Sequence, residues 1–363
     1  MKKYLNYFLL SLFALVVFNS CSKDDPELYP SALVKGAYII NYGSYDKGGS
    51  GISKYDYEKD ELTNFYDQQQ NKGAAFASNI QFAYKTGDKV FLMANSPDQI
   101  ISLDPLMVQA KNGVTDQIAK PRNCVADGKY LYVSCWGENP DWNVMPDSYI
   151  AKYNIETGMV EKKIALAGGP EGLEISNGKL YAALNFKKAV AVVDLTTEAI
   201  SYIETPAVCS YLLKDNSGNL YVSLISSYTI QATKTGLGFI NTSTNSLTVY
   251  ELENVSTEYA SIMAFSKDKS KIYIAAAAYD ANWVMVGGVK VFDVTAKTFA
   301  ASSLINGITG LKGISVNPVD GNIYVFVSPS ATNNGLMKIY YESGQAIAEK
   351  TVGASPIMAI FLN

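Results

Sequence analysis

The sequence contains no histidine in 363 residues, and it has only four cysteines and three tryptophans. Without histidine the chain has no Ser–His or Cys–His nucleophile pair, no histidine general base and no histidine-ligated metal. Its charges nearly balance, with 30 Lys and Arg against 34 Asp and Glu, and they form no basic stripe. The composition therefore argues against a nucleic-acid partner, and we expect a protein that binds without catalysing a reaction or holding a cofactor or metal.

The few cysteines divide into one near the N-terminus, Cys21, and three in the body of the chain, Cys124, Cys135 and Cys209. An odd number in the body gives no disulfide framework. Cys124 and Cys135 lie on adjacent expected strands, but spacing alone does not fix a bridge. We expect buried thiols.

The longest apolar run, Tyr4–Phe18, is too short for a comfortable membrane span and follows the basic start Met1-Lys2-Lys3. This layout is typical of a secretory signal, which we predict over residues 1–20. Cys21 comes directly after a small residue at the end of this segment, as in bacterial lipoprotein signals, although Phe18 stands where a Leu is usual. We predict lipidation of Cys21, and several acyl chains would give stable anchoring. The alternative is an ordinary secretion signal with a chance cysteine.

Residues 21–35 contain two prolines and several charges, which predicts a lipidated flexible tether. Its sequence Lys23-Asp24-Asp25 resembles the acidic signal that sends lipoproteins of Bacteroides-like bacteria to the outer face of the outer membrane. The resemblance implies a lipid-anchored, extracellular location.

The rest of the chain, 36–363, is built from a repeat of about 40 to 53 residues. Each copy has an apolar residue before Tyr or Phe, followed by small or β-branched residues. The seven aromatic positions are Tyr38, Phe91, Tyr132, Tyr181, Tyr221, Tyr273 and Tyr324. A second short apolar strand ending in Asp or Asn follows most of them, as in Val192-Val193-Asp194, and the acidic or amide side chain should cap the next turn.

Seven copies of four short strands predict an all-β fold, a seven-bladed β-propeller with four-stranded antiparallel blades. The aromatic of the second strand should pack between neighbouring sheets. The segment Pro356–Leu362 has the pattern of an innermost strand without followers, whereas the first copy, at Tyr38, lacks an innermost strand. We therefore expect the C-terminal strand to join the first blade and close the ring. A non-closing sandwich or solenoid is the alternative.

In a propeller, the loops from second to third strand and the links between blades open on one face. All three tryptophans fall in these loops, with tyrosines, asparagines and an arginine beside them. Such residues offer large, stiff contact area with polar handles, which favours a binding site; the alternative is that long loops bury their own aromatics. Arg122 and Glu171 are equally well interpreted as ligand contacts or as an ion pair between blades. The candidate ligand-binding residues are Tyr42, Asn79, Asn95, Arg122, Trp136, Asn139, Trp142, Asn185, Phe186, Tyr211, Tyr228, Tyr259, Tyr279 and Trp283.

The acidic tether, the opening Asn41-Tyr42-Gly43 and the repeated Leu-Tyr-Val and Tyr-Asp strands together resemble the surface-lipoprotein propellers of Bacteroides, of the YncE-like and surface-layer type. Among these, the chain is most similar to the BtuG-type lipoproteins. The resemblance implies capture of cobalamin (vitamin B12) and its transfer to a TonB-dependent outer-membrane transporter of the BtuB type. A glycan- or protein-binding surface propeller is the alternative, since no short motif specifies cobalamin.

Overall fold

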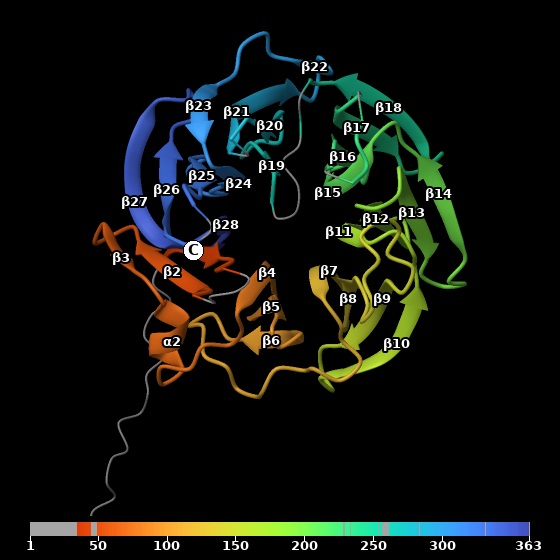
Figure 1. Cartoon of the computed structure of the whole chain (residues 1–363), viewed down its shortest axis with the longest axis horizontal. Coiled ribbons are helices and arrows are strands. Elements are labelled where there is room, and N and C mark those ends of the chain that lie inside the picture. Colours follow the sequence, from red (N-terminus) through yellow and green to blue (C-terminus); the bar gives the residue numbers. More distant parts are fainter. Residues whose placement is uncertain are drawn as a thin grey trace, which may run out of the picture. The chain divides into compact units, whose positions relative to one another are not determined.

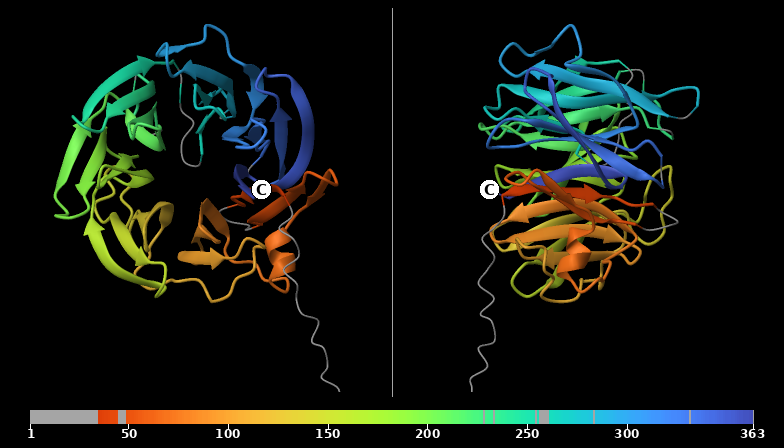
Figure 2. Two further views of the ribbon diagram at one scale, coloured as in Figure 1. Left: turned by 180° about the vertical axis from the view of Figure 1, so that it is seen from behind. Right: turned by 90° about the vertical axis from the view of Figure 1, so that its left-hand side faces the viewer.

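The computed structural model describes residues 35–44, 49–227, 229–232, 234–253, 255, 261–282, 284–330 and 332–362. The chain divides into two compact units, Met1–Val34 and Lys35–Asn363. The predicted signal and lipidated Cys21 lie outside the described residues. In the second unit the strands form seven antiparallel sheets arranged around one axis (Figures 1 and 2), which confirms the predicted seven-bladed β-propeller.

The blades follow one another along the chain. Within each blade the strands lie side by side, from the innermost strand at the ring axis to the outermost. The first four, from the innermost strand outward, are β28 (Pro356–Leu362), β1 (Gly36–Asn41), β2 (Gly51–Asp56), β3 (Glu61–Thr63); β4 (Asn79–Thr86), β5 (Lys89–Asn95), β6 (Gln99–Leu103); β7 (Pro121–Asp127), β8 (Tyr130–Cys135), β9 (Tyr149–Asn154), β10 (Met159–Ala165); and β11 (Pro170–Ser176), β12 (Lys179–Leu184), β13 (Ala189–Asp194), β14 (Ile200–Glu204).

The other three blades, in the same order, are β15 (Val208–Lys214), β16 (Leu220–Ile225), β17 (Gly236–Asn241), β18 (Ser246–Glu251); β19 (Met263–Phe265), β20 (Lys271–Tyr279), β21 (Met285–Asp293), β22 (Thr298–Phe299), with β23 (Ile305–Thr309) added to β21; and β24 (Leu311–Val316), β25 (Ile323–Val327), β26 (Asn334–Tyr340), β27 (Ala346–Ala354). A short helix, α2 (Tyr66–Gln70), precedes the second blade.

The ring closes as the complementary chain ends predict. Strand β28 pairs antiparallel with β1, in a register that sets Gly36 opposite Leu362 and Asn41 opposite Pro356. The last strand of the chain is therefore the innermost strand of the first blade. Pairing this strand leaves no blade without an axial strand, and ring closure limits the exposed sheet edges.

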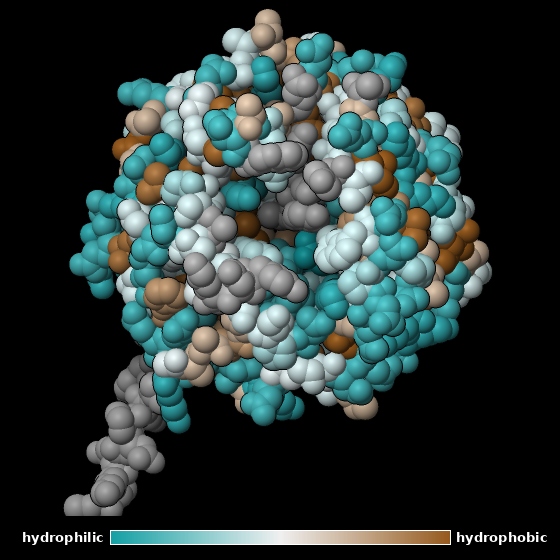
Figure 3. All heavy atoms as spheres, viewed as in Figure 1, coloured by the Kyte–Doolittle hydropathy of each residue, from teal (hydrophilic) through white to brown (hydrophobic). Residues whose placement is uncertain are grey.

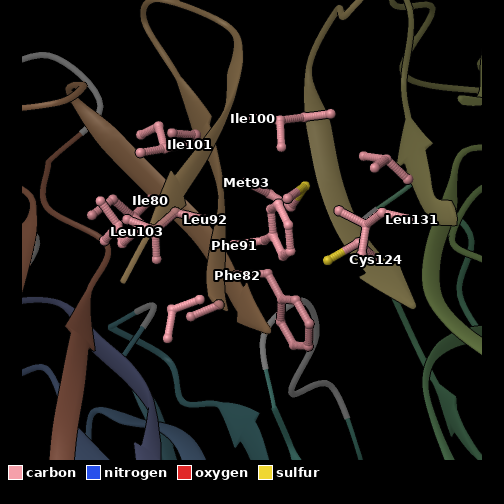
Figure 4. Close-up of a cluster of buried hydrophobic side chains, with 14 of the residues drawn as sticks. Ile80, Phe82, Phe91, Leu92, Met93, Ile100, Ile101, Leu103, Cys124 and Leu131 are labelled. Atoms are coloured by element: carbon pink, nitrogen blue, oxygen red, sulfur yellow. The ribbon is translucent and has the colours of Figure 1, made fainter. Parts of the chain in front are cut away.

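The repeated aromatics lie in the core. All seven, from Tyr38 to Tyr324, are buried. In the second blade Phe91 packs with Met93 toward Cys124 and Leu131 of the third blade (Figure 4), and its ring centroid lies 6.1 Å from that of Tyr153. The prediction that these rings fill the space between neighbouring sheets is confirmed.

Carboxylates and amides at the ends of the third strands hold the turns that follow. The N–H groups of Thr196 and Thr197 donate to Asp194 Oδ1 at 2.9 and 2.8 Å. Asn154 and Asp293 accept two backbone N–H groups in the same way. These side chains satisfy backbone donors that a tight turn would otherwise leave open, as the sequence predicts.

The second blade departs most from the repeat. Its sheet has three strands, and the fourth position is occupied by a segment that reaches β6 through two isolated bridges, Ile100 with Val114 and Leu103 with Gln109. Asn71, just after α2, ties this segment down: its Nδ2 donates to the Met107 carbonyl at 2.7 Å, and its Oδ1 accepts the Gln109 N–H at 2.8 Å. The outer edge of β6 is therefore covered rather than open.

The three cysteines of the propeller are free and buried, as expected, and Cys124 does not pair with Cys135. Burial raises the pKa of both Cys135 and Cys209 to about 12, so neither is a thiolate at neutral pH. No helix within the described residues is long and apolar enough to cross a membrane.

Candidate functional site

Most of the innermost strands carry a β-bulge close to their first residue. The register shifts near the start of β4, β7, β11, β15, β24 and β28, so that an extra residue enters the innermost strand. A bulge re-aims side chains at the place where a strand begins, next to the links between blades in this fold. We call the first residues of these bulges the belt; they are Gln81, Arg122, Glu171, Ser210, Lys312 and Ile357.

Side chains of the belt are joined across three blades. Arg122 forms a two-point ion pair with Glu171, with Nε–Oε2 at 2.9 Å and Nη2–Oε1 at 3.2 Å. Its Nη1 donates to Gln81 Oε1 at 2.6 Å. Gln81 Nε2 donates to Asn95 Oδ1 at 2.6 Å, and Asn95 Nδ2 donates to Asp98 Oδ1 at 3.2 Å. The resulting polar chain runs along one side of the axis.

The ion pair at the centre of this chain is buried, with Arg122 8% and Glu171 4% exposed. Burial raises the pKa of Glu171 above its usual range, and the attraction of Arg122 offsets this only in part. Of the two interpretations of these residues, the structure therefore supports an ion pair between the third and fourth blades. Such a pair tolerates the loss of one partner poorly, because the other charge is left without compensation.

An aromatic cluster lies directly against the ion pair. The guanidinium of Arg122 sits 4.1 Å from the ring centroid of Trp136. Trp136 in turn meets Phe186 at 5.3 Å and Trp142 at 5.8 Å, both edge to face, and buried Met145 completes the cluster. Trp136 and Phe186 are buried, whereas Trp142 is 54% exposed. The cluster thus connects the polar belt to solvent through one indole ring.

Local hydrogen bonds hold the turn that carries Trp142. Asp141 Oδ1 accepts the N–H and Nδ2 of Asn143 at 3.0 and 3.1 Å, and the Asp141 carbonyl accepts the N–H groups of Val144 and Met145. An exposed ring on a turn fixed in this way loses little conformational entropy when a ligand covers it.

The axis is obstructed by two rings from blades that are not neighbours. Phe82 on β4 and Tyr211 on β15 approach with their centroids 6.4 Å apart. Tyr211 packs against the hydrophobic clusters on both sides of the ring, and burial raises its pKa to about 12. Figure 3 shows the molecule hollowed at the centre of the ring, where both hydrophilic and hydrophobic residues are visible.

A separate pocket of about 410 Å³ lies on the flank of the third blade. The ammonium of Lys163 stands 4.6 Å from the ring centroid of Tyr149, and the lining is Gly137, Glu138, Asn139, Pro146, Asp147, Ser148, Tyr149, Lys163 and Ala165. Its charged side chains are exposed and of both signs. Its buried hydroxyls, on Ser148 and Tyr149, are already bonded to backbone groups of the protein. We take the belt and the aromatic cluster as the candidate site.

Comparison with known proteins places the chain in a family. Residues 35–353 match the family described as a domain of unknown function, DUF5074. The chain belongs to the DUF5074 family. No curated protein matches it in sequence.

Solved structures share the fold of this DUF5074 chain. A quinonprotein alcohol dehydrogenase-like protein from Bacteroides thetaiotaomicron is 15% identical with a TM-score of 0.68, covering 91% of this chain and 78% of its own. A periplasmic gluconolactonase from Pseudomonas aeruginosa is 14% identical with a TM-score of 0.64, covering 90% and 99%. A protein from Lactobacillus plantarum is 14% identical at 0.65, covering 91% and 99%. At such identities the likeness shows the propeller fold alone.

The predicted binding residues of this DUF5074 propeller fall into distinct groups. Five of them form the connected site: Asn95, Arg122, Trp136, Trp142 and Phe186. Tyr42 and Asn79 lie together where the first and second blades meet, with Asn79 Nδ2 3.5 Å from the Tyr42 carbonyl.

The remaining predicted residues lie elsewhere. Asn185 is buried and donates to the Cys209 carbonyl at 3.2 Å, which is a link between blades. Tyr211 obstructs the axis, and Asn139 lines the flank pocket. Tyr279 is exposed at the end of β20. Tyr228, Tyr259 and Trp283 lie outside the described residues.

Sequence reasoning missed Gln81, Phe82 and Lys312. A signal for them exists, because each follows a link between blades at the same repeat position as Arg122 or the residue after it. Aligning the starts of the innermost strands, rather than the loops, would have found them.

No group of three or more His, Cys, Asp or Glu in the described part of the chain is placed to hold a metal ion.

Proposed function

We propose that this DUF5074 propeller is a non-catalytic binding protein that captures a large amphipathic ligand at the belt and the aromatic cluster, and that the ligand is cobalamin. One observation carries the proposal: Arg122 stacks on Trp136, which joins a buried hydrogen-bonding network to an exposed indole at Trp142. A site of this kind presents apolar area and oriented polar groups side by side.

Cobalamin suits such a site because it combines a broad ring system with amides around its edge. The exposed face of Trp142 offers a surface for the ring system. The oxygens of Glu171 and Gln81 already accept from Arg122, but each can accept a second hydrogen bond from a ligand amide. The resemblance to surface-lipoprotein propellers of Bacteroides supports this ligand. The lack of histidine fits a protein that holds the ligand intact, since no imidazole competes for its metal.

The proposed setting is the outer face of the outer membrane, with a lipid on Cys21 and a TonB-dependent transporter of the BtuB type as partner. The basic start, the apolar run and the position of Cys21 support the anchor. Metabolic labelling with an alkyne fatty acid tests it: the wild-type chain should incorporate label and the Cys21→Ser variant should not. Equal labelling of both would reject the lipid anchor.

Isothermal titration of the purified chain with cyanocobalamin tests the ligand. We expect a dissociation constant well below micromolar, because capture ahead of a transporter needs tight binding. Trp142→Ala should weaken binding by about tenfold or more, as truncation of a central aromatic contact does. Tyr341→Ala is the matched control: this aromatic is 50% exposed on the turn after β26, away from the cluster, and its loss should leave binding unchanged.

Two outcomes would replace the proposal. Failure to bind cyanocobalamin at micromolar protein, together with binding on a glycan array that Trp142→Ala abolishes, would identify a glycan-binding propeller using the same indole. Equal loss of affinity in the Trp142 and Tyr341 variants would remove the aromatic cluster from the site.

A further inference from the structure

The belt below the aromatic cluster has a mixed chemical character. It combines the amide of Gln81 with the compensated pair Arg122–Glu171, whereas Ser210 is fully buried. Lys312 adds a positive charge on the opposite side of the ring, at the bulge of β24. The belt therefore holds N–H donors together with amide and carboxylate acceptors, at a small net charge.

A ligand group that enters the hollow meets Phe82 and Tyr211, whose ring centroids lie 6.4 Å apart across the axis. These two rings narrow the way through the propeller. The bulges of neighbouring blades are also in close contact: a Cβ placed on Gly172 would lie 2.7 Å from the Ser210 carbonyl oxygen, and one on Gly313 would lie 2.0 Å from that of Ile357. The belt is too tightly packed to widen, so it accepts only a small group at its centre.

The charges of the belt favour a ligand carboxamide over a ligand carboxylate. Glu171 already compensates Arg122 through two contacts, so the guanidinium does not present an uncompensated charge. A carboxylate from a ligand only accepts hydrogen bonds and would stand near the Glu171 carboxylate. A carboxamide both donates and accepts, and it brings no charge into a buried setting.

We propose that the belt recognises a carboxamide of the bound ligand and discriminates against the corresponding carboxylate. This inference rests on the proposed cobalamin function and adds to it the group that the axis selects. The aromatic cluster supplies area for binding, and the belt supplies chemical selectivity.

The test compares cyanocobalamin with its monocarboxylic acid derivatives, in which a single propionamide of the ring is converted to propionate. Isothermal titrations of the purified chain should show at least one derivative bound about tenfold or more weakly, since a lost hydrogen bond near a charged group has that effect. The derivative with the largest loss identifies the amide at the belt.

Two variants should shift this ratio in opposite directions. Glu171→Gln keeps an acceptor for Arg122 but leaves its charge uncompensated, so the preference for the amide should shrink to within about twofold. Lys312→Gln removes a cation and should increase the preference. Trp142→Ala is the control, because it should weaken binding of the amide and the acid by the same factor. Thermal unfolding of each variant confirms that the fold is retained.

The outcomes separate this inference from the proposed function. If the wild-type chain binds no cobalamin, both fail. If it binds cyanocobalamin and every monocarboxylic derivative equally well, the carboxamide inference alone fails. An unchanged ratio in Glu171→Gln and Lys312→Gln, in folded protein, also overturns it, since the selectivity would then arise elsewhere on the surface.

Discussion

The two sides of the belt are built in different ways. On one side, in the second to fourth blades, the bulges carry long polar side chains, and Gln81, Arg122 and Glu171 bond to one another across the blades. On the other side, in the seventh and first blades, a glycine replaces side-chain contact: Gly313 lies against the carbonyls of Ile357 and Ser261. The first side is joined by charged and amide side chains. The second side is joined by close backbone packing and by hydrogen bonds of Ser261 and Ser315.

The difference indicates which side of the belt can distinguish one ligand from another. Close backbone packing fixes the ring geometry but presents few groups that a ligand can distinguish. The polar side presents oriented donors and acceptors, and it alone adjoins the Trp136 cluster. A ring of nearly equivalent blades thus acquires a single functional sector from a few residues at equivalent positions.

Breaking the polar side should produce the largest effect. Arg122→Ala leaves Glu171 buried without its cation, and we expect a loss of about 3–5 kcal/mol in unfolding free energy. Urea unfolding measures it. The comparison variant is Lys234→Ala, which breaks the Lys234–Glu251 pair, where the side chains are 62% and 60% exposed; its effect should stay below about 1 kcal/mol. Equal small effects would mean that the belt pair adds nothing to stability.

Breaking the backbone side should cost less but still destabilise the ring. Gly313→Ala places a Cβ 2.0 Å from the Ile357 carbonyl oxygen, so the seventh and first blades must separate. We expect a loss of about 2–3 kcal/mol, as for other overpacked positions. Gly178→Ala is the control: it has a φ of +71°, but nothing lies near its added Cβ, so it should cost only about 1 kcal/mol of backbone strain. If both alanines cost the same, close approach at the belt is not the cause.

The repeat made the fold predictable. The buried aromatics from Tyr38 to Tyr324, the turn caps such as Asp194 and the closure by Pro356–Leu362 all follow from local patterns. Each of these features depends on residues close in sequence or on the order of the copies. That is the information a single chain displays directly.

The belt could not be predicted as a whole, because its members are far apart in sequence. Gln81 and Arg122 are 41 positions apart, and Arg122 and Glu171 are 49 apart. Only the radial arrangement of the blades brings them together. The bulges that orient these side chains are visible in the strand pairing but not in the residue types. The burial of Trp136 likewise depends on Phe186 from the next blade. Sequence patterning found the indoles but did not separate the buried ring from exposed Trp142.

A second buried carboxylate sharpens the comparison, because no cation among the described residues pairs with it. Asp67 in α2 is buried and accepts the Ile52 N–H on Oδ1 at 2.8 Å. Burial raises its pKa to about 6, and the backbone N–H groups only partly offset this. The folded state therefore binds a proton at this carboxyl more tightly than the unfolded chain does. The resulting stabilisation is complete below the ordinary pKa of an aspartate, near 4, and is lost as the pH rises through about 6.

Asp67→Asn keeps the Oδ1 acceptor for Ile52 without the charge, so it should be more stable than wild type by roughly 1–2 kcal/mol at pH 7 and no more stable at pH 4. Urea unfolding of both proteins at the two pH values measures the difference. A variant that is less stable at pH 7 would show that Asp67 is better solvated than its burial implies. Glu171 has the cation that Asp67 lacks. The pH dependence of stability that disappears in Asp67→Asn therefore measures the effect of burying a carboxylate. The unfolding free energy lost in Arg122→Ala measures the effect of pairing one.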